Sequence, residues 1–389
     1  MLNRAVWVEI NLDHLVHNIS EVRRVTGQDA LVTAVIKADG YGHGAVNIAR
    51  TLLDNGADRL AVATLTEAVQ LRRSFPSEEI LILGFTEETS INLAIRHQLI
   101  QTIYTLEQAR AFNDVAKSMD EKLKVHIKLD TGMTRLGMMP EVNTIDQIEQ
   151  MLSLDHIEIE GMYTHFARAD EADKTTTLKQ IENFEFVRKG LKERNIEFKI
   201  NHVSNSAGII DLPEYNYDMV RAGIMLYGLY PSDEVDHAEV KLKEVMSLHT
   251  KISRVQDVEA GVGVSYGHKY ITSEPTRIGT LPIGYADGFS RSLSFKAQAI
   301  IKGKNKKVPV IGRICMDQCM IDLSGVDAEI GDEVILFGQD DQMAITIDEI
   351  AGHLGTINYE VVCMINRRVP RVYTKSGEVV KTVDYIMSL

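Results

Sequence analysis

The stretch LVTAVIKADGYGHG, residues 31–44, joins a short β-branched apolar run to a lysine and then to a glycine-rich turn. Seven similar apolar runs follow it, and segments with helical spacing separate them. The eight runs are LVTAVI (31–36), LAVA (60–63), EILILG (79–84), LIQTIY (99–104), KVHIKL (124–129), IEIEGMYTHF (157–166), FKINHVS (198–204) and YDMVRAGIMLYG (217–228). Eight strand–helix repeats, followed by a segment with a different pattern of apolar and polar residues, predict a closed (β/α)8 barrel.

The competing architecture is an open, doubly wound sheet. Segments between the runs, such as AVNIARTLLDNGA and LKQIENFEFVRKGLKERNI, have the spacing of helices that cover a barrel. The turn GYGHG lacks the G-x-G-x-x-G pattern of a dinucleotide-binding sheet, and nothing marks a switch point between two halves. We therefore assign residues 11–235 to a barrel.

The pattern changes after about Ser232 to alternating, glycine-punctuated segments, which predict a mainly β domain over residues 236–389. In this domain KGKNKK predicts a hairpin turn. TIDEIAGHLGT predicts a lone helix, and a last strand is expected near YEVVCMINRRVPRVY. Residues 1–10 alternate as well and are a candidate to pair with this domain from the other end of the chain.

The chain is acidic, with 42 Lys and Arg against 55 Asp and Glu and a formal net charge of −13. This surface repels nucleic acid and anionic lipid, so neither is an expected partner. The first residues lack the apolar core of a signal peptide, and no stretch reaches the ~18 consecutive apolar residues of a membrane-spanning helix. Three cysteines favour the reducing cytoplasm. The spacing of Cys315 and Cys319 predicts packed thiols and no metal site.

Polar residues recur where the predicted barrel strands end, which is where barrel enzymes build their sites. They are Lys37, Arg135, His165, Ser206 and Arg221. A hydroxyl and a glycine backbone after strands seven and eight commonly hold a phosphate. A partly desolvated lysine condenses with aldehydes, and pyridoxal phosphate supplies both an aldehyde and a phosphate. An isolated K-x-D-G is most often a surface lysine, so this interpretation depends on the other motifs.

Nine strings carry a resemblance through nearly the whole chain, in order: AVIKADGYGHG, DTGMTRLG, YTHFA, SNSA, VRAGIMLYG, GVSYG, PIGYADG, GRICMDQ and INYE. Together they resemble the bacterial alanine racemases. The resemblance implies a pyridoxal phosphate enzyme with a barrel and a C-terminal β domain. It also implies a homodimer that interconverts L-alanine and D-alanine by two-base proton transfer and supplies D-alanine for peptidoglycan.

The resemblance also implies roles for individual residues. Lys37 would hold the cofactor and act as one base, and Tyr266 of the partner subunit would be the second. His165 would support Tyr266, and Arg221 would bond the pyridine nitrogen. The remaining assignments are Tyr41, Ser206, Tyr359 and the backbone of Gly223 and Ile224 for the phosphate, and Arg135 with the backbone of Met316 for the substrate carboxylate. Lys128 matches a lysine that some family members carbamylate, with a plain ion-pairing lysine as the alternative.

Physical chemistry gives reasons for these residue types. Inverting a stereocentre through a planar carbanion needs one base on each face. A tyrosine titrates near ~10 and acts as a base only beside positive charge, which His165 and Arg221 together are expected to supply. An arginine at the pyridine nitrogen cannot accept a proton, so it makes the cofactor a shallower electron sink than a carboxylate would.

Three alternatives stay open. A serine racemase of broader specificity is one, although Tyr285 and Tyr359 would narrow the entrance in favour of a methyl side chain. A decarboxylase of the same barrel class is another, and Arg221 argues against it because a glutamate is expected there. A non-catalytic pyridoxal phosphate carrier is the third, but it would not need the β domain that brings Tyr266 and Met316.

Overall fold

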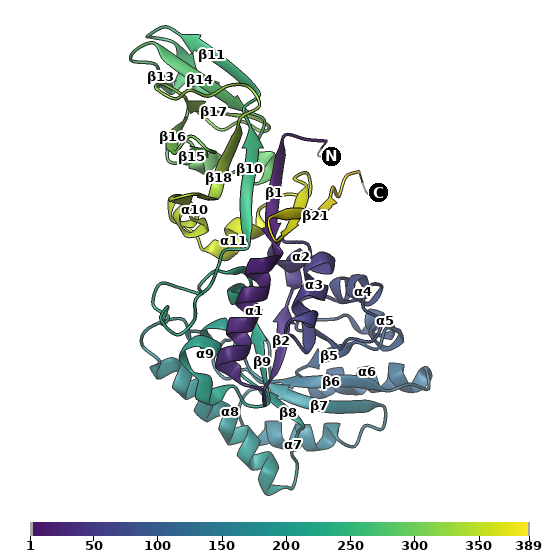
Figure 1. Ribbon diagram of the computed structural model, residues 1–389. Coiled ribbons are helices and arrows are strands. Elements are labelled where there is room, and N and C mark those ends of the chain that lie inside the picture. Colours follow the sequence, from purple (N-terminus) through teal and green to yellow (C-terminus); the bar gives the residue numbers. More distant parts are fainter. Residues whose placement is uncertain (1–2, 388–389) are drawn as a thin grey trace. The chain divides into compact units, whose positions relative to one another are not determined.

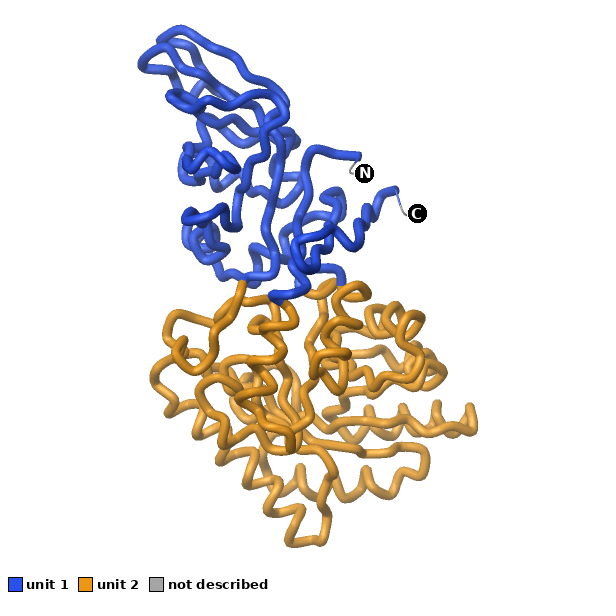
Figure 2. Tube along the Cα trace, in the orientation of Figure 1, with its two compact units in different colours: residues 1–14, 41–44, 244–389 blue, residues 15–40, 45–243 orange. Residues whose placement is uncertain are grey.

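The computed structural model describes residues 3–387, and contacts within it divide the chain into two compact units (Figure 2). Unit 1 comprises residues 1–14, 41–44 and 244–389. Unit 2 comprises residues 15–40 and 45–243. The chain therefore enters unit 1 three times. The domain boundaries expected from the sequence, 11–235 and 236–389, differ from these units chiefly in the two short N-terminal segments that belong to unit 1.

Unit 2 is built on an eight-stranded parallel sheet in the order β8-β7-β6-β5-β4-β3-β2-β9 (Figure 1). Two backbone hydrogen bonds of 3.1 Å, Asp218 to Asn201 and Arg221 to Ser204, span the remaining gap between β8 and β9. The predicted (β/α)8 barrel is thus confirmed as a nearly closed one. Its strands are β2 (Leu31–Val35), β3 (Arg59–Val62), β4 (Ile80–Ile82), β5 (Ile100–Ile103), β6 (Leu123–Lys128), β7 (Ile157–Tyr163), β8 (Ile200–His202) and β9 (Met219–Ala222).

Helices follow the barrel strands in alternation, as the periodicity predicts. Most strand residues are buried on both faces, because helices cover the outside of the sheet and side chains fill its inside. The helical elements are α1 (Leu12–Thr26), α2 (Lys37–Tyr41), α3 (Ala45–Asp54), α4 (Leu65–Arg72), η1 (Glu88–Ser90), α5 (Ile91–Arg96), α6 (Leu106–Ser118), α7 (Val142–Met151), α8 (Thr175–Glu193), α9 (Ser206–Asp211), η2 (Pro213–Tyr215) and η3 (Ile224–Tyr227).

Unit 1 is mainly β, as expected. Its large sheet has the order β11-β14-β17-β16-β15-β18-β10-β1-β20-β21, with β19 paired to β18, and β12 pairs with β13. The strands are β1 (Val6–Asn11), β10 (Met246–Lys251), β11 (Arg254–Val258), β12 (Gly263–Val264), β13 (Tyr270–Ile271), β14 (Thr276–Leu281), β15 (Gln298–Ile301), β16 (Lys306–Ile311), β17 (Cys319–Asp322), β18 (Glu333–Asp340), β19 (Met343–Ile345), β20 (Arg371–Lys375) and β21 (Glu378–Val383).

Strand β1 lies inside this sheet. It pairs antiparallel with β10, Val6 opposite Thr250, and parallel with β20, Val8 opposite Arg371. Figure 1 shows β1, from the start of the chain, beside β10 and close to β21. The sheet of unit 1 is therefore assembled from both ends of the sequence.

The helices of unit 1 differ in one place from the sequence prediction. KGKNKK does form the turn between β15 and β16, and TIDEIAGHLGT does form a helix, α10 (Ile347–Leu354). That helix is not alone, because α11 (Asn358–Cys363) occupies the start of the expected strand. The strand begins only at Arg371, and it is not the last one, because β21 follows it. Burial at Asn358, Val361, Val362 and Ile365 has helical spacing.

The short helices of unit 1 are η4 (Tyr266–His268), η5 (Tyr285–Asp287) and η6 (Arg291–Leu293). Across residues 3–387 no helix has the length and apolarity that crossing a membrane requires.

Candidate active site

Lys37 follows β2 at the carboxyl end of the barrel strands, where a left-handed turn begins. Residues 38–40 have φ angles of 52°, 53° and 63°, and left-handed backbone is costly for residues that carry a Cβ. The backbone N–H of Ala38 donates to Glu67 Oε1 at 2.6 Å, and the same carboxylate caps α4. The half-buried Lys37 is therefore held at the entrance of a strained, anchored turn.

Arg221 on β9 is buried among acceptors at the same end of the barrel. Its NH1 donates to Nδ1 of His202 at 2.8 Å, and its NH2 lies 2.7 Å from the carbonyl oxygen of Thr164 and 2.9 Å from that of Val203. NH2 also lies 3.3 Å from Nδ1 of His165. Burial lowers the pKa of Arg221 to about 10, so the guanidinium stays protonated at neutral pH.

His165, directly after β7, is a neutral imidazole in this setting. Burial, followed by the charge of Arg221, lowers its pKa well below the usual value. An arginine only donates, so Nδ1 of His165 accepts and Nε2 carries the proton. The positive charge that we expected from His165 and Arg221 together therefore comes from Arg221 alone.

Lys128 and Arg135 add to a group of cations at the strand ends. Burial, Arg135 and Arg221 lower the pKa of Lys128 to about 8, and Lys37 contributes to the same effect. The loop that carries Arg135 is folded around Asp130, whose carboxylate accepts the N–H groups of Gly132, Thr134 and Arg135 at 3.1, 2.9 and 2.8 Å. Several positive side chains with one nearby carboxylate form a site suited to anionic groups.

Two short turns meet at Ser206. Ser206 begins α9 and Ile224 begins η3, and the N–H groups of Gly223 and Met225 donate to the Ser206 hydroxyl at 3.0 and 3.5 Å. N–H groups at the first turns of helices attract anions, and here two of them converge on one hydroxyl. The structure thus brings the predicted residues Ser206, Gly223 and Ile224 together beside the end of β9.

Unit 1 holds the other predicted residues in two places. In the first, Tyr41 and Tyr359 lie with ring centroids 6.2 Å apart. Burial raises the pKa of Tyr41, so its hydroxyl stays protonated. A Cβ at Gly42 would lie 2.4 Å from the carbonyl oxygen of Val362, so the glycine allows the segment 41–44 to pack against α11.

In the second place, Tyr266 and Met316 line one cavity of about 710 Å³ between β11, β12, β14 and β17. Tyr266 is 71 % exposed and Met316 53 %, unusual values for large apolar side chains. Tyr285, 41 % exposed, lies close by along the backbone, because its N–H donates to the carbonyl oxygen of Cys315 at 3.1 Å.

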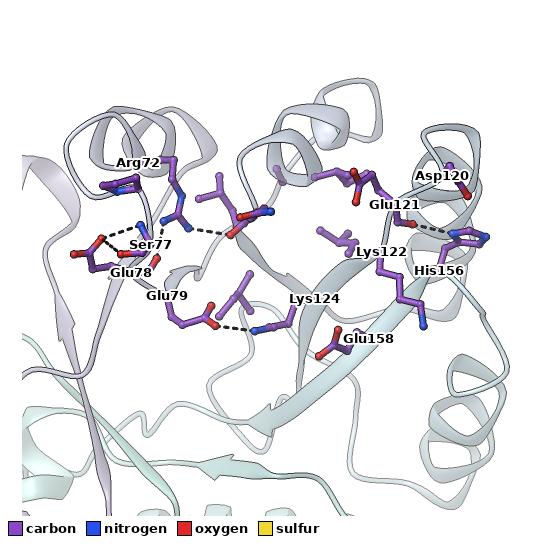
Figure 3. Close-up of a pocket in the computed structure, with 17 residues that line it drawn as sticks. Arg72, Ser77, Glu78, Glu79, Asp120, Glu121, Lys122, Lys124, His156 and Glu158 are labelled. Atoms are coloured by element: carbon purple, nitrogen blue, oxygen red, sulfur yellow. Dashed lines mark hydrogen bonds and ion pairs between the residues drawn. The ribbon is translucent and has the colours of Figure 1, made fainter.

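Another cavity, of about 520 Å³, lies at the amino ends of β4 to β7 (Figure 3). It is lined by Arg72, Glu79, Lys124, His156 and their neighbours, and it contains none of the predicted site residues. Enzymes with this fold have their active sites at the carboxyl ends of the strands. This cavity lies at the amino ends, so it is not the candidate site.

Sequence reasoning missed the groups behind Arg221. His202, His126 and Glu160 lie inside the barrel, where aliphatic side chains are usual. The sequences KVHIKL and IEIEG contain the signal that could have revealed them. Helices cover the outside of these strands, so the polar residues at alternate positions must point into the barrel.

A lysine and a buried arginine among further cations, at the carboxyl ends of barrel strands, are typical of a barrel enzyme that works on an anionic compound. Comparison with known proteins makes the class specific. Residues 10–231 match the model of the alanine racemase N-terminal domain, and residues 245–373 match that of the C-terminal domain.

Full-length relatives agree. The chain is 48 % identical to the alanine racemase of Clostridium tetani (strain Massachusetts / E88), over 98 % of this chain and 99 % of that protein. Among solved structures, alanine racemase of Clostridium difficile 630 superposes with a TM-score of 0.95 at 45 % identity, covering 99 % and 100 % of the two chains. The alanine racemase of Bacillus anthracis with bound L-Ala-P superposes with a TM-score of 0.94 at 35 % identity, and 100 % of both chains is covered. The chain belongs to the alanine racemase family, whose members are isomerases.

Proposed function

We propose that this chain interconverts L-alanine and D-alanine with pyridoxal 5'-phosphate held on the Lys37 amine, and that it works as a homodimer. The family is pyridoxal phosphate-dependent in general. The observation that carries the proposal is the buried Arg221, a permanently charged partner for a ring nitrogen beside a strand-end lysine. When bound, the cofactor withdraws electrons from the α carbon and so acidifies its hydrogen.

The residues at the barrel end fit such a cofactor. Lys37 supplies the amine, and it lies in the group of cations at the strand ends, where burial and positive neighbours lower the pKa of Lys128 to about 8. The turn of Ser206, Gly223 and Ile224 would bind the phosphate, whose oxygen would take the place of the Ser206 hydroxyl as acceptor of the Gly223 N–H. Tyr41 and Tyr359 add two phenol hydroxyls, and the raised pKa of Tyr41 keeps its hydroxyl a donor.

Two bases divide the reaction between them. Lys37 accepts or donates the proton on one face of the substrate, and the Tyr266 hydroxyl serves the other. Tyr266 is strongly exposed on unit 1, where a second copy of the chain would cover it. Because Arg221 supplies a fixed positive charge and His165 presents an Nε2–H donor, a phenolate near them is stabilised.

Arg135 and the backbone of Met316 would hold the substrate carboxylate. The loop of Arg135 is rigidly folded on Asp130, which suits a residue that orients a ligand. Met316 shares its cavity with Tyr266, so a carboxylate held there would lie within reach of the second base.

Arginine at residue 221 favours racemisation over decarboxylation. A carboxylate at this position would accept a hydrogen bond from a protonated ring nitrogen and so favour that form, which withdraws more electrons from the α carbon. Arg221 only donates, so it favours the unprotonated nitrogen, the weaker electron sink, and would limit transamination. Racemisation of serine is the second candidate. In the family pattern Tyr285 and Tyr359 would narrow the entrance, and such a narrowing favours the smaller methyl group.

The product would supply D-alanine for peptidoglycan. We infer that the enzyme works in the cytoplasm, and the support is the small number of cysteines, three in the chain.

The test is a chiral assay of the purified, cofactor-loaded protein with L-alanine and with D-alanine. Both should reach the same equal mixture, because enantiomers have equal free energies. Lys37→Ala should abolish both conversions and the visible absorption of the bound cofactor. Optically unchanged alanine would contradict the proposal, and carbon dioxide release would favour the decarboxylase. Parallel reactions with serine and larger amino acids measure the breadth of specificity.

A further inference from the structure

A row of hydrogen-bonded polar side chains runs through the interior of the barrel, from Arg221 toward the amino ends of the strands. Arg221 NH1 lies 2.8 Å from His202 Nδ1, His202 Nε2 lies 2.8 Å from His126 Nδ1, and His126 Nε2 lies 2.9 Å from Glu160 Oε2. Arg59 closes the row with two bonds to the Glu160 carboxylate, at 2.6 and 3.2 Å. All five side chains are buried.

The chemistry of the two ends fixes the direction of every bond in the row. A guanidinium only donates, so His202 Nδ1 accepts and its proton is on Nε2. His202 therefore donates to His126 Nδ1, and His126 keeps its own proton on Nε2 and donates it to Glu160. Both imidazoles are consequently neutral Nε2–H tautomers.

The surroundings agree with this assignment. Burial, with the charges of Arg221 and Arg59, lowers the pKa of His202, and burial lowers that of His126 against the opposing effect of Glu160. The other charged group that faces the carboxylate is Lys124, 3.6 Å from Glu160. Figure 3 shows the bond of Lys124 to Glu79, which is 2.7 Å long.

Packing holds both rings in place. His202 stacks on Tyr163 with centroids 4.6 Å apart and an interplanar angle of 10°, and His126 meets His202 edge-on at 5.0 Å. Gly161 makes room for the row, because a Cβ there would lie 2.9 Å from His126 Cε1. Neither imidazole can turn over without displacing its neighbours.

We propose that Glu160 and His126 are positioning residues for the reaction: the carboxylate sets the tautomer of His126, His126 sets that of His202, and His202 thereby presents an acceptor that orients the Arg221 guanidinium toward the cofactor ring. The inference rests on the proposed function of Arg221. It extends the site from the strand ends to the middle of the barrel, into residues that touch neither substrate nor cofactor.

The first measurement tests the tautomers without using activity. In the full-length protein labelled with ¹⁵N-histidine, with and without pyridoxal phosphate, His126 and His202 should each show one protonated Nε2 and one accepting Nδ1, unchanged between about pH 6 and pH 8. Signals are assigned by loss in His126→Gln and His202→Gln. A protonated Nδ1 on His202 in the wild-type protein would overturn the inference.

The second measurement compares Glu160→Gln with Lys124→Gln. A glutamine amide both donates and accepts, so Glu160→Gln should mix the His126 tautomers, lower kcat about tenfold with KM nearly unchanged, and raise the ratio of transamination to racemisation. Lys124→Gln changes the charge beside the same carboxylate but leaves the row intact, and it should keep tautomers and kcat within about twofold of wild type.

The outcomes separate the two proposals. A folded Glu160→Gln variant with unchanged tautomers or unchanged kcat and reaction ratio would overturn the positioning role. If Glu160→Gln does not fold, Glu160→Asp replaces it, since a shorter carboxylate keeps the charge and loosens the bond to His126. Correct tautomers in a wild-type protein that does not racemise alanine would instead contradict the proposed function.

Discussion

The guanidinium of Arg221 donates to Nδ1 of His202 across 2.8 Å. A buried imidazole thus binds the cation at the strand ends from the interior of the barrel. Arg221 also donates to the carbonyl oxygens of Thr164 and Val203, at two neighbouring strand ends, and its NH2 lies 3.3 Å from Nδ1 of His165. The cation is therefore held from three sides, and its charge is independent of pH over the physiological range.

Replacing Arg221 by glutamate should change which reaction follows proton removal. A carboxylate that accepts a hydrogen bond from the ring nitrogen keeps this nitrogen protonated and makes the cofactor a stronger electron sink, so racemisation should fall about 100-fold while transamination of the cofactor rises. Arg221→Lys keeps the charge and loses the planar fork, so it should slow racemisation without raising transamination. Rates of D-alanine and pyruvate formation measure the two reactions. Equal reaction ratios in the two variants would exclude the charge argument.

Removing the hydroxyl of Tyr266 should leave a one-base enzyme. Tyr266→Phe should lower kcat by about 10²- to 10⁴-fold, the usual contribution of one acid–base group. Exchange of the α hydrogen with deuterated solvent should persist for one enantiomer of alanine and be lost for the other, because one face keeps its base.

The matched control is Tyr270→Phe, a nearby tyrosine that packs against Val264, Ile278 and Ile311. It should retain most of the activity. Equal loss of exchange for both enantiomers in Tyr266→Phe would argue against bases on opposite faces.

Lys128 should cost stability in the cofactor-free protein below about pH 8. Its pKa in the folded chain is about 8, below the ordinary value, so the folded state disfavours the charged form. The penalty is fully present below the folded pKa and disappears as the pH rises toward the unfolded value of ~10.4. Lys128→Met should therefore raise the free energy of unfolding at pH 7 by about 1–3 kcal/mol, and this advantage should shrink above pH 8.

Urea unfolding from pH 6 to pH 10, in buffer freed of carbon dioxide, measures the difference between Lys128→Met and the wild-type chain. Carbon dioxide is removed because a carbamylated Lys128 would carry a negative charge. An advantage that does not change with pH would show that packing, and not charge, explains it.

Gly161→Ala should destabilise the barrel. The added Cβ would lie 2.4 Å from the carbonyl oxygen of Ile200 on the adjacent strand, and backbone there cannot yield without shifting β8. Overpacking of this kind costs about 1–3 kcal/mol. Gly352→Ala is the comparison, because a Cβ there meets nothing within 4 Å and the residue is inside α10.

Gly352→Ala should be neutral or stabilising by up to about 1 kcal/mol, since alanine favours the helix. Thermal unfolding of both variants gives the test. A Gly161→Ala protein as stable as Gly352→Ala would mean that β7 and β8 adjust their spacing freely.

The eight barrel strands were predictable because each apolar run is short, is followed by a helical segment and has both faces buried. Every run quoted from the sequence overlaps one strand from β2 to β9. Helix α11 was missed because Val361 and Val362 favour a strand locally, although their spacing with Asn358 and Ile365 is helical.

Site residues were predictable only where the neighbouring sequence shows that they lie at the end of a barrel strand. Lys37, Ser206 and Arg221 follow apolar runs, and the end of a barrel strand is informative by itself. Tyr266 and Met316 were assigned through the resemblance alone, because 50 residues separate two side chains that share a cavity. His126 and Glu160 were overlooked because polar side chains are rare inside a barrel, although their alternate positions in β6 and β7 indicate that they point inward.

The position of β1 has a consequence for how the protein is made. Strand β1 pairs through Val6 with Thr250 of β10 and through Val8 with Arg371 of β20. It therefore cannot pair on either side until these residues have been synthesised. At ~5–20 residues per second the ribosome needs roughly 20–70 s to reach them. During that time the nascent chain carries an unsatisfied β edge at its leading end while the barrel segments emerge behind it. The first strand to be synthesised is thus among the last to be paired.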